Sequence, residues 1–73
     1  MQKDKNIIIY MIYVLRQFAL EKKMQPSDAY KYLHKYKGID FLNQNYGYEH
    51  TLSIEEIIDD VTKICQKNGG NIK

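Results

Sequence analysis

The feature that most constrains the fold is the run NIIIYMIYVL at residues 6–15, which is apolar except for Asn6. Apolar side chains recur through this run and beyond it at spacings of three and four residues, the period of a helix. We therefore predict a first helix over about residues 5–23. Two adjoining stripes carry its apolar face: Ile7, Met11, Val14 and Phe18, then Ile8, Ile12, Leu15 and Ala19.

This apolar face is wider than a surface helix needs. Ile9, Tyr10 and Tyr13 lie outside both stripes and extend it. A helix that is apolar nearly all round is buried on most sides, and three further short helices can hardly cover it. We expect a protein partner, either a second copy or a different protein, to bind there. The alternative is that the isoleucines form a generous core.

The same run has two further interpretations. It is shorter than the roughly 20 apolar residues of a membrane span, so we expect no membrane partner. Lys3 and Lys5 precede it as in a signal peptide, but no small-residue cleavage site follows in RQFALEKKMQP. We therefore expect the run to stay in the folded protein.

The length of 73 residues predicts a single domain over residues 1–73, with frayed ends at 1–4 and 69–73. Cys65 is the one cysteine, so no intramolecular disulfide can form, which fits the cytoplasm. No cysteine or histidine pair has zinc-ligand spacing. We expect no metal and no cofactor.

Two short helices are predicted in the middle of the chain. Pro26 suits the first position of the second helix, and Gly38 would end that helix in the left-handed conformation. The segment IDFLNQNYG indicates a third helix that would end before Gly47. Its inward side chains would be Ile39, Leu42 and Tyr46.

The last helix has the clearest start signal. Ser53 and Glu56 have the spacing of a capping box, and Gly69 would end the helix. The chain is thus predicted to be an all-α compact bundle of about four helices. One apolar stripe of the last helix would face the core: Ile54, Ile57, Ile58, Val61, Ile64 and Cys65.

No catalytic set is visible. Acids in the first turns of a helix stabilise its positive end, so Glu55, Glu56, Asp59 and Asp60 do not indicate a metal site. Cys65 falls on an apolar stripe, where a thiol behaves as a small hydrophobic group. No nucleophile motif or phosphate-binding loop occurs. We predict no enzymatic activity.

Nucleic acid is the alternative ligand. Lys31, Lys35 and Lys37 alternate with tyrosines, and Asn43 and Gln44 could contact base edges. The second and third predicted helices, joined at Gly38, would form a helix-turn-helix-like core of a small transcriptional regulator, with IDFLNQNY as its recognition helix. However, the net charge is only +2, and this helix contains no lysine or arginine for phosphate contacts. Protein binding is therefore the preferred prediction.

Tyrosines are enriched where proteins bind one another. His50 and Thr51 precede the last helix, where they would either satisfy backbone groups of a turn or contact a partner. The interface candidates, beyond the three residues of the first helix, are Tyr30, Tyr32, Tyr36, Tyr46, Tyr48, His50 and Thr51.

One set of positions within residues 6–65 forms a recognisable pattern: Tyr30, Leu33, Tyr36, Gly38, Asp40, Phe41, Leu42, Tyr46, His50, Thr51, Asp59 and Asp60. At these positions the chain resembles a family of small bacterial proteins known only as a domain of unknown function. Lys37 departs from the family pattern, because tyrosine there usually precedes glycine directly, and Val61 stands where isoleucine is usual. Neither departure affects the expected fold.

The resemblance implies a short cytoplasmic protein encoded near a larger protein that resembles an ADP-ribosyltransferase toxin. An antitoxin-like or accessory role beside such an enzyme follows as an expectation. The resemblance also adds Tyr46 to His50 and Thr51 as candidate partner contacts, and the interpretation of these residues as part of a turn stays open beside it.

Overall fold

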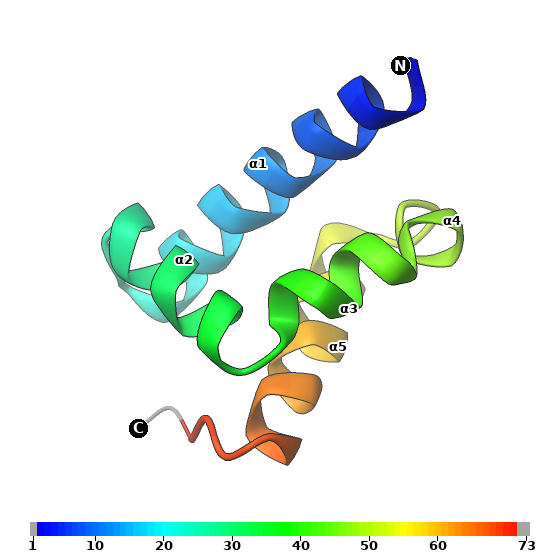
Figure 1. Cartoon of the computed structure of the whole chain (residues 1–73). Coiled ribbons are helices and arrows are strands. Elements are labelled where there is room, and N and C mark those ends of the chain that lie inside the picture. The colour runs from blue at the N-terminus through cyan, green and yellow to red at the C-terminus, as the bar shows by residue number, and fades with distance from the viewer. Residues whose placement is uncertain (1, 72–73) are drawn as a thin grey trace.

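Residues 2–71 are described by a computed structural model, and helices dominate this part of the chain (Figure 1). The prediction of an all-α bundle is confirmed, and residues 2–71 form five helices in place of about four. None of them is long and apolar enough to cross a membrane. Their bounds are α1 Gln2–Lys22, α2 Pro26–Lys35, α3 Gly38–Gln44, α4 Tyr46–Glu49 and α5 Ile54–Lys67.

α1 is the longest element and contacts α2, α3 and α5 (Figure 1). It starts at Gln2, earlier than the expected residue 5. Its end lies in a tight turn, in which Lys23 has a φ of 57° and the Met24 N–H donates to the Ala19 carbonyl at 2.9 Å. This bond satisfies a terminal carbonyl and turns the chain into α2.

The core is built from one side of each of four helices. Leu33 from α2, Leu42 from α3 and Phe18 from α1 are almost completely buried. The prediction for α5 is confirmed, because the centre of its apolar stripe is buried and Ile54 and Ile64 are partly covered. The buried set is Val14, Phe18, Ala19, Ala29, Leu33, Leu42, Ile57, Ile58, Val61 and Cys65.

The corner between α2 and α3 differs from the prediction at Gly38. The left-handed residue is Lys37, with a φ of 72°, and Gly38 is the buried first residue of α3. A Cβ atom on Gly38 would lie 2.9 Å from the Cys65 Sγ and 2.9 Å from a Leu33 methyl carbon. Glycine is therefore required here for the close approach of α3 to α5, and its conformational freedom is not what the site uses.

The prediction that α3 ends before Gly47 omitted a helix. The chain breaks at Asn45 and forms α4, a single turn that contains Gly47. The Glu49 N–H donates to the Asn45 carbonyl at 2.8 Å, and the His50 N–H donates to the Tyr46 carbonyl at 3.0 Å. These backbone hydrogen bonds extend the helical region through Gly47, so the glycine alone did not predict where it ends.

α5 begins and ends as predicted. The Ser53 hydroxyl accepts from the Glu56 N–H at 3.2 Å, and the Glu56 carboxylate accepts from the Ser53 N–H at 3.1 Å. Gly69 follows the helix with a φ of 98°. Within the tail that was predicted to fray, Gly70 is buried and accepts a hydrogen bond from the Tyr32 hydroxyl. Residues 72 and 73 of that predicted tail lie outside the described residues.

Candidate binding surface

The surplus apolar side of α1 is exposed in the structure. We call Ile8, Ile9, Ile12, Tyr13 and Leu20 the outer α1 face. Between 48% and 73% of each of these side chains is accessible, with Leu20 the most exposed. A groove of about 340 Å³ runs along this face, with Arg16 and Gln17 among its polar lining residues. The described helices therefore leave uncovered the side of α1 that the sequence marks as too apolar for solvent.

A second apolar groove adjoins the outer α1 face. It has a volume of about 140 Å³ and shares Ile12 with the first groove. Its other walls include Leu15, Tyr30 and Ile39, so it connects α1 to α2 and α3. Three predicted interface residues, Ile9, Tyr13 and Tyr30, thus line one connected surface.

Two predicted interface tyrosines belong to the packing of the core instead. The Tyr32 ring stacks on Phe18 at a centroid distance of 5.8 Å and lies 5.0 Å from the Tyr36 ring. Burial, followed by the nearby Cys65, raises the pKa of Tyr32 to about 12. The Tyr36 ring also covers Gly70, where a Cβ atom would lie 2.6 Å from it. The structure thus uses both rings to hold α2 against the end of α5.

The predicted residues around α4 form a separate aromatic stack. The Tyr10 and Tyr46 rings meet edge to face at 5.0 Å, and His50 stacks on Tyr46 at 4.6 Å. The His50 Nδ1 lies 2.6 Å from the Tyr46 carbonyl, and the Thr51 hydroxyl donates to the Tyr48 carbonyl at 2.7 Å. These are the backbone contacts of a turn, so both side chains have a local structural task.

The sequence did not predict the burial of Glu49. Only 2% of this residue is exposed, and its Oε1 has no hydrogen-bond partner within the described part of the chain. Burial, then the neighbouring Asp60 and Glu56, raises the pKa of Glu49 to about 7. The hydroxyl of Tyr10 is a second buried group without a partner there, and burial followed by the charge of Glu49 raises its pKa to about 12. A useful sequence signal would have been Glu49 one helical turn after Tyr46, but it requires knowing that α4 exists.

The residues proposed for nucleic-acid binding are all exposed, but they are spread over α2, the α2–α3 corner and α3. Lys31 and Lys35 lie on α2, where the Lys35 ammonium sits 5.4 Å from the Tyr36 ring centroid. Asn43 and Gln44 lie near the end of α3, a helix of only seven residues. A helix this short could place few side chains in the major groove of DNA.

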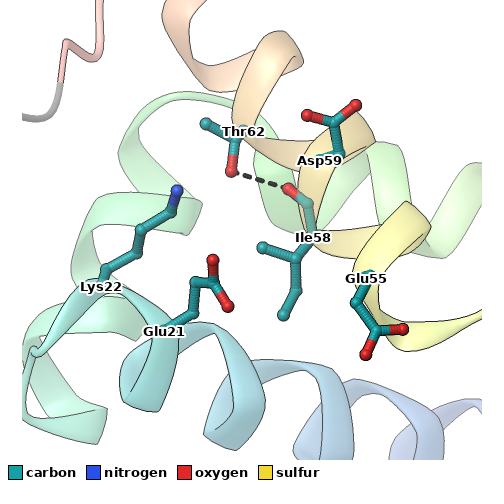
Figure 2. Close-up of a pocket in the computed structure, with 6 residues that line it drawn as sticks. All are labelled: Glu21, Lys22, Glu55, Ile58, Asp59 and Thr62. Atoms are coloured by element: carbon teal, nitrogen blue, oxygen red, sulfur yellow. Dashed lines mark hydrogen bonds between the residues drawn. The ribbon is translucent and has the colours of Figure 1, made fainter.

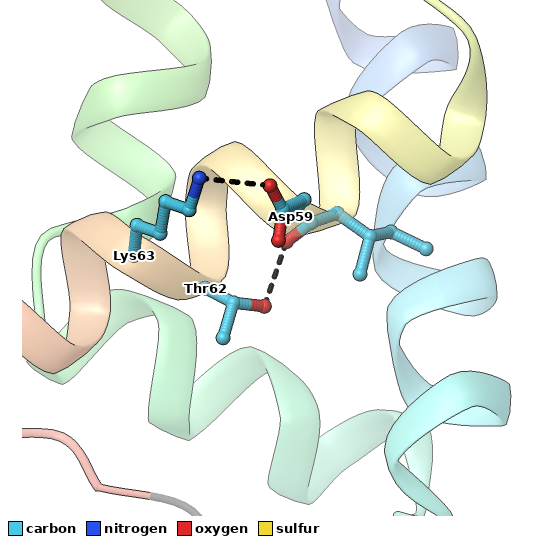
Figure 3. A network of polar contacts seen from close by, with 4 residues as sticks. Asp59, Thr62 and Lys63 are labelled. Carbon is cyan, nitrogen blue, oxygen red and sulfur yellow. Dashed lines mark hydrogen bonds and ion pairs between the residues drawn. The ribbon is translucent and has the colours of Figure 1, made fainter.

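An acidic cleft separates the end of α1 from α5 (Figure 2). It has a volume of about 190 Å³ and is lined by Glu21, Glu55 and Asp59, with Lys22 reaching across one wall. The Asp59 carboxylate is bound by Lys63 at 3.1 Å in an exposed pair (Figure 3). Within residues 5–71, no three histidine, cysteine or acidic side chains form a group that could hold a metal ion.

Two potential nucleophiles of α5, one in the acidic cleft and one in the core, both have structural roles. The Thr62 hydroxyl donates to the Ile58 carbonyl one turn earlier at 2.7 Å (Figure 3). The Cys65 thiol is buried, and that burial raises its pKa to about 11, far from the range in which a thiolate forms readily. The cleft therefore provides charge without an activated nucleophile.

Comparisons with known proteins identify one family. Residues 9–68 match the family described as "Protein of unknown function (DUF3791)", which covers most of the chain. No curated protein and no solved structure matches. The family description names no catalytic activity.

Proposed function

We propose that this chain, which belongs to the DUF3791 family, is a protein-binding module, because one apolar side of α1 is exposed. The observation that supports the proposal is the outer α1 face, five large apolar side chains that are each about half exposed or more. Apolar patches of this kind mark interaction sites in soluble proteins. The binding surface extends from this face to Tyr30 through the shared groove residue Ile12.

The charge on this surface favours a different protein over a second copy. Arg16 lines the groove, and no carboxylate among the described side chains forms an ion pair with it. Two copies packed through this face would each bring an arginine into the same apolar interface. A partner with an apolar surface and one acidic side chain opposite Arg16 would bury the face and pair the charge.

The resemblance to small bacterial proteins supplies a candidate partner. We propose that the partner is the neighbouring toxin-like enzyme and that the chain acts in the cytoplasm as an antitoxin-like or accessory subunit. Binding through an apolar face would inhibit such an enzyme by covering its surface, which requires no catalytic group on this chain. A subunit that works only in a complex would have an apolar face that is exposed in the isolated chain. The exposed outer α1 face therefore supports this role.

Co-expression tests the proposal directly. The chain and the product of the adjacent gene are purified together and their mass is measured by light scattering, beside the 8.7 kDa chain alone. The Ile9→Lys, Ile12→Lys double variant should lose the complex, because it places two charges in the apolar groove. Its matched control, Lys31→Ser with Lys35→Ser on α2, should retain it. Equal retention by both variants would contradict the role of α1, and a concentration-dependent dimer of the chain alone would assign the face to a second copy.

Nucleic-acid binding stays as the second candidate, because Lys31, Lys35 and Lys37 are all exposed. It predicts binding to labelled DNA or RNA that weakens steeply as salt is raised. The same α2 variant that serves as the control above should then lose binding, whereas the α1 variant should keep it. Anisotropy that stays flat at low salt would remove this candidate.

A further inference from the structure

A third surface lies away from the outer α1 face and shares no lining residue with it. This groove, of about 380 Å³, lies between α5 and the pair α3 and α4. Phe41, Tyr48 and Ile64 provide apolar and aromatic walls, and the carboxyl groups of Glu49 and Asp60 line it as well. We call it the carboxyl groove.

One oxygen of an acid in the carboxyl groove has no hydrogen-bond partner among the described residues. The acid is Glu49, of which only 2% is exposed, and the oxygen without a partner is its Oε1. A buried polar atom without a partner is destabilising, so native proteins rarely keep one without a reason. An incoming hydrogen-bond donor would remove that cost.

The remaining charge in the groove is negative. Lys63 is the basic lining residue, and its ammonium is bound to Asp59 at 3.1 Å (Figure 3). Asp60 forms no ion pair within the described residues. Two carboxyl groups therefore face one cation that is already engaged elsewhere, and the groove has room for a second cation.

We propose that the carboxyl groove binds an arginine side chain of a partner protein. A guanidinium group carries five donors in one plane and can bind two carboxyl groups at once. Its planar face also stacks on aromatic rings, which Phe41 and Tyr48 provide. The aliphatic part of the side chain would pack against Ile64. Lysine, a strongly hydrated point charge, fits this combination of walls and acids less well.

The proposal goes beyond the protein-binding role of α1 and is tested without any partner. Nα-acetyl-arginine amide serves as the probe in an NMR titration at constant ionic strength. Nα-acetyl-citrulline amide, which has nearly the same shape and no charge, is the control ligand. We expect saturable shifts at the amides of groove residues with a dissociation constant on the order of 10 mM. Equal shifts with the citrulline compound, or shifts that do not saturate, would overturn the proposal.

Variants localise the binding. Asp60→Asn should weaken the arginine probe about fivefold, the effect of losing one partly exposed ion pair. Glu55→Gln removes the same charge from the same helix outside the groove and should change the affinity by less than about twofold. Lys63→Gln should tighten binding, because it removes a positive charge on the groove wall that repels the guanidinium group. An Asp60→Asn variant with unchanged affinity would place the probe elsewhere.

The dependence on pH tests the part played by Glu49. The titratable groups around this carboxyl are Tyr10 from α1 and Glu56 and Asp60 from α5, with Lys63 on the groove wall. The probe should bind more tightly at about pH 8 than at about pH 6, because the acid loses its proton in that interval. Glu49→Gln should flatten this profile while its circular dichroism spectrum stays helical. A profile that the substitution leaves unchanged would exclude Glu49 from the site.

These results separate the two proposals. The Ile9→Lys, Ile12→Lys variant should bind the arginine probe as the natural chain does, since the two surfaces share no residue. Loss of the partner complex without loss of probe binding would support the carboxyl groove as an independent arginine site. Absence of saturable probe shifts would overturn the carboxyl groove proposal and would not affect the proposed α1 interface.

Discussion

The two sides of α1 place similar side chains in opposite environments. On the inner side, Val14 and Phe18 are completely buried against the other helices. On the outer side, Ile12 and Leu20 are 51% and 73% exposed. The difference shows that the apolar residues of a helix predict how much of its surface is suited to burial, whereas the neighbouring helices decide which part is buried. Here the other described helices cover only the inner side of α1.

Two leucines give the largest expected contrast between buried and exposed positions. Leu33→Ala should lower the free energy of unfolding by about 2–5 kcal/mol, because it leaves a cavity in the core. Leu20→Ala, the same change on the outer α1 face, should alter it by less than about 0.5 kcal/mol. Urea unfolding followed by circular dichroism measures both. A large loss at Leu20 would mean that the outer face is already covered, for instance by a second copy.

Two glycines sharpen the comparison by adding a methyl group. Gly38→Ala should destabilise the fold by about 1–3 kcal/mol, because the new Cβ atom would overlap the side chains of α2 and α5. Gly47→Ala has nothing within 4 Å of its new atom and should be neutral or stabilise α4 by roughly 0.5–1 kcal/mol. The same urea experiment decides. Equal stability of the two variants would disprove the close approach at Gly38.

These two pairs also show what the sequence could predict. Periodicity identified α1 and α5, and local signals gave the Ser53 cap and the Gly69 end, because those features depend on neighbouring residues. The requirement for glycine at position 38 depends on Cys65, which lies 27 positions later in the chain. Rules that use only neighbouring residues cannot detect a contact between such distant positions. The sequence therefore predicted a left-handed helix end at Gly38, whereas the glycine is needed for close packing.

The candidate sites divide in the same way. Ile9, Tyr13 and Tyr30 were predicted from composition, and the structure exposes them on connected grooves. Tyr32 was predicted for the same surface, yet it packs on Phe18. Glu49 was not predicted at all, because acids are normally exposed and its burial depends on α1 and α5 packing around a one-turn helix.

The buried acid predicts an effect of similar size that depends on pH. A pKa of about 7 in the folded chain against 4.5 for an ordinary glutamate means that folding favours the protonated form. The cost is absent below about pH 4.5, grows between about pH 4.5 and 7, and is complete above that. Glu49→Gln should therefore be more stable than the natural chain at about pH 8, by on the order of 1–3 kcal/mol, and about equally stable near pH 4.5. Unfolding curves at both pH values give the difference, and parallel pH profiles would contradict it.

The smallest expected effect is on the outer α1 face itself. The Ile9→Lys, Ile12→Lys variant should change the free energy of unfolding by less than about 0.5 kcal/mol, because these side chains lose little burial and lysine is a good helix former. Thermal and urea unfolding of the isolated chain provide the measurement. A marked loss of stability would show that the isoleucines support the fold and are not held in reserve for a partner.

The buried thiol of Cys65 can report how often the core of this chain opens. A bulky thiol reagent reaches that sulfur only when α3 and α5 separate, so the labelling rate in native buffer reports how often the core opens. There is no second cysteine to confuse the signal. A bound partner that covers α1 would slow the label without touching the sulfur, so ligands could be found by their effect on a residue they never contact.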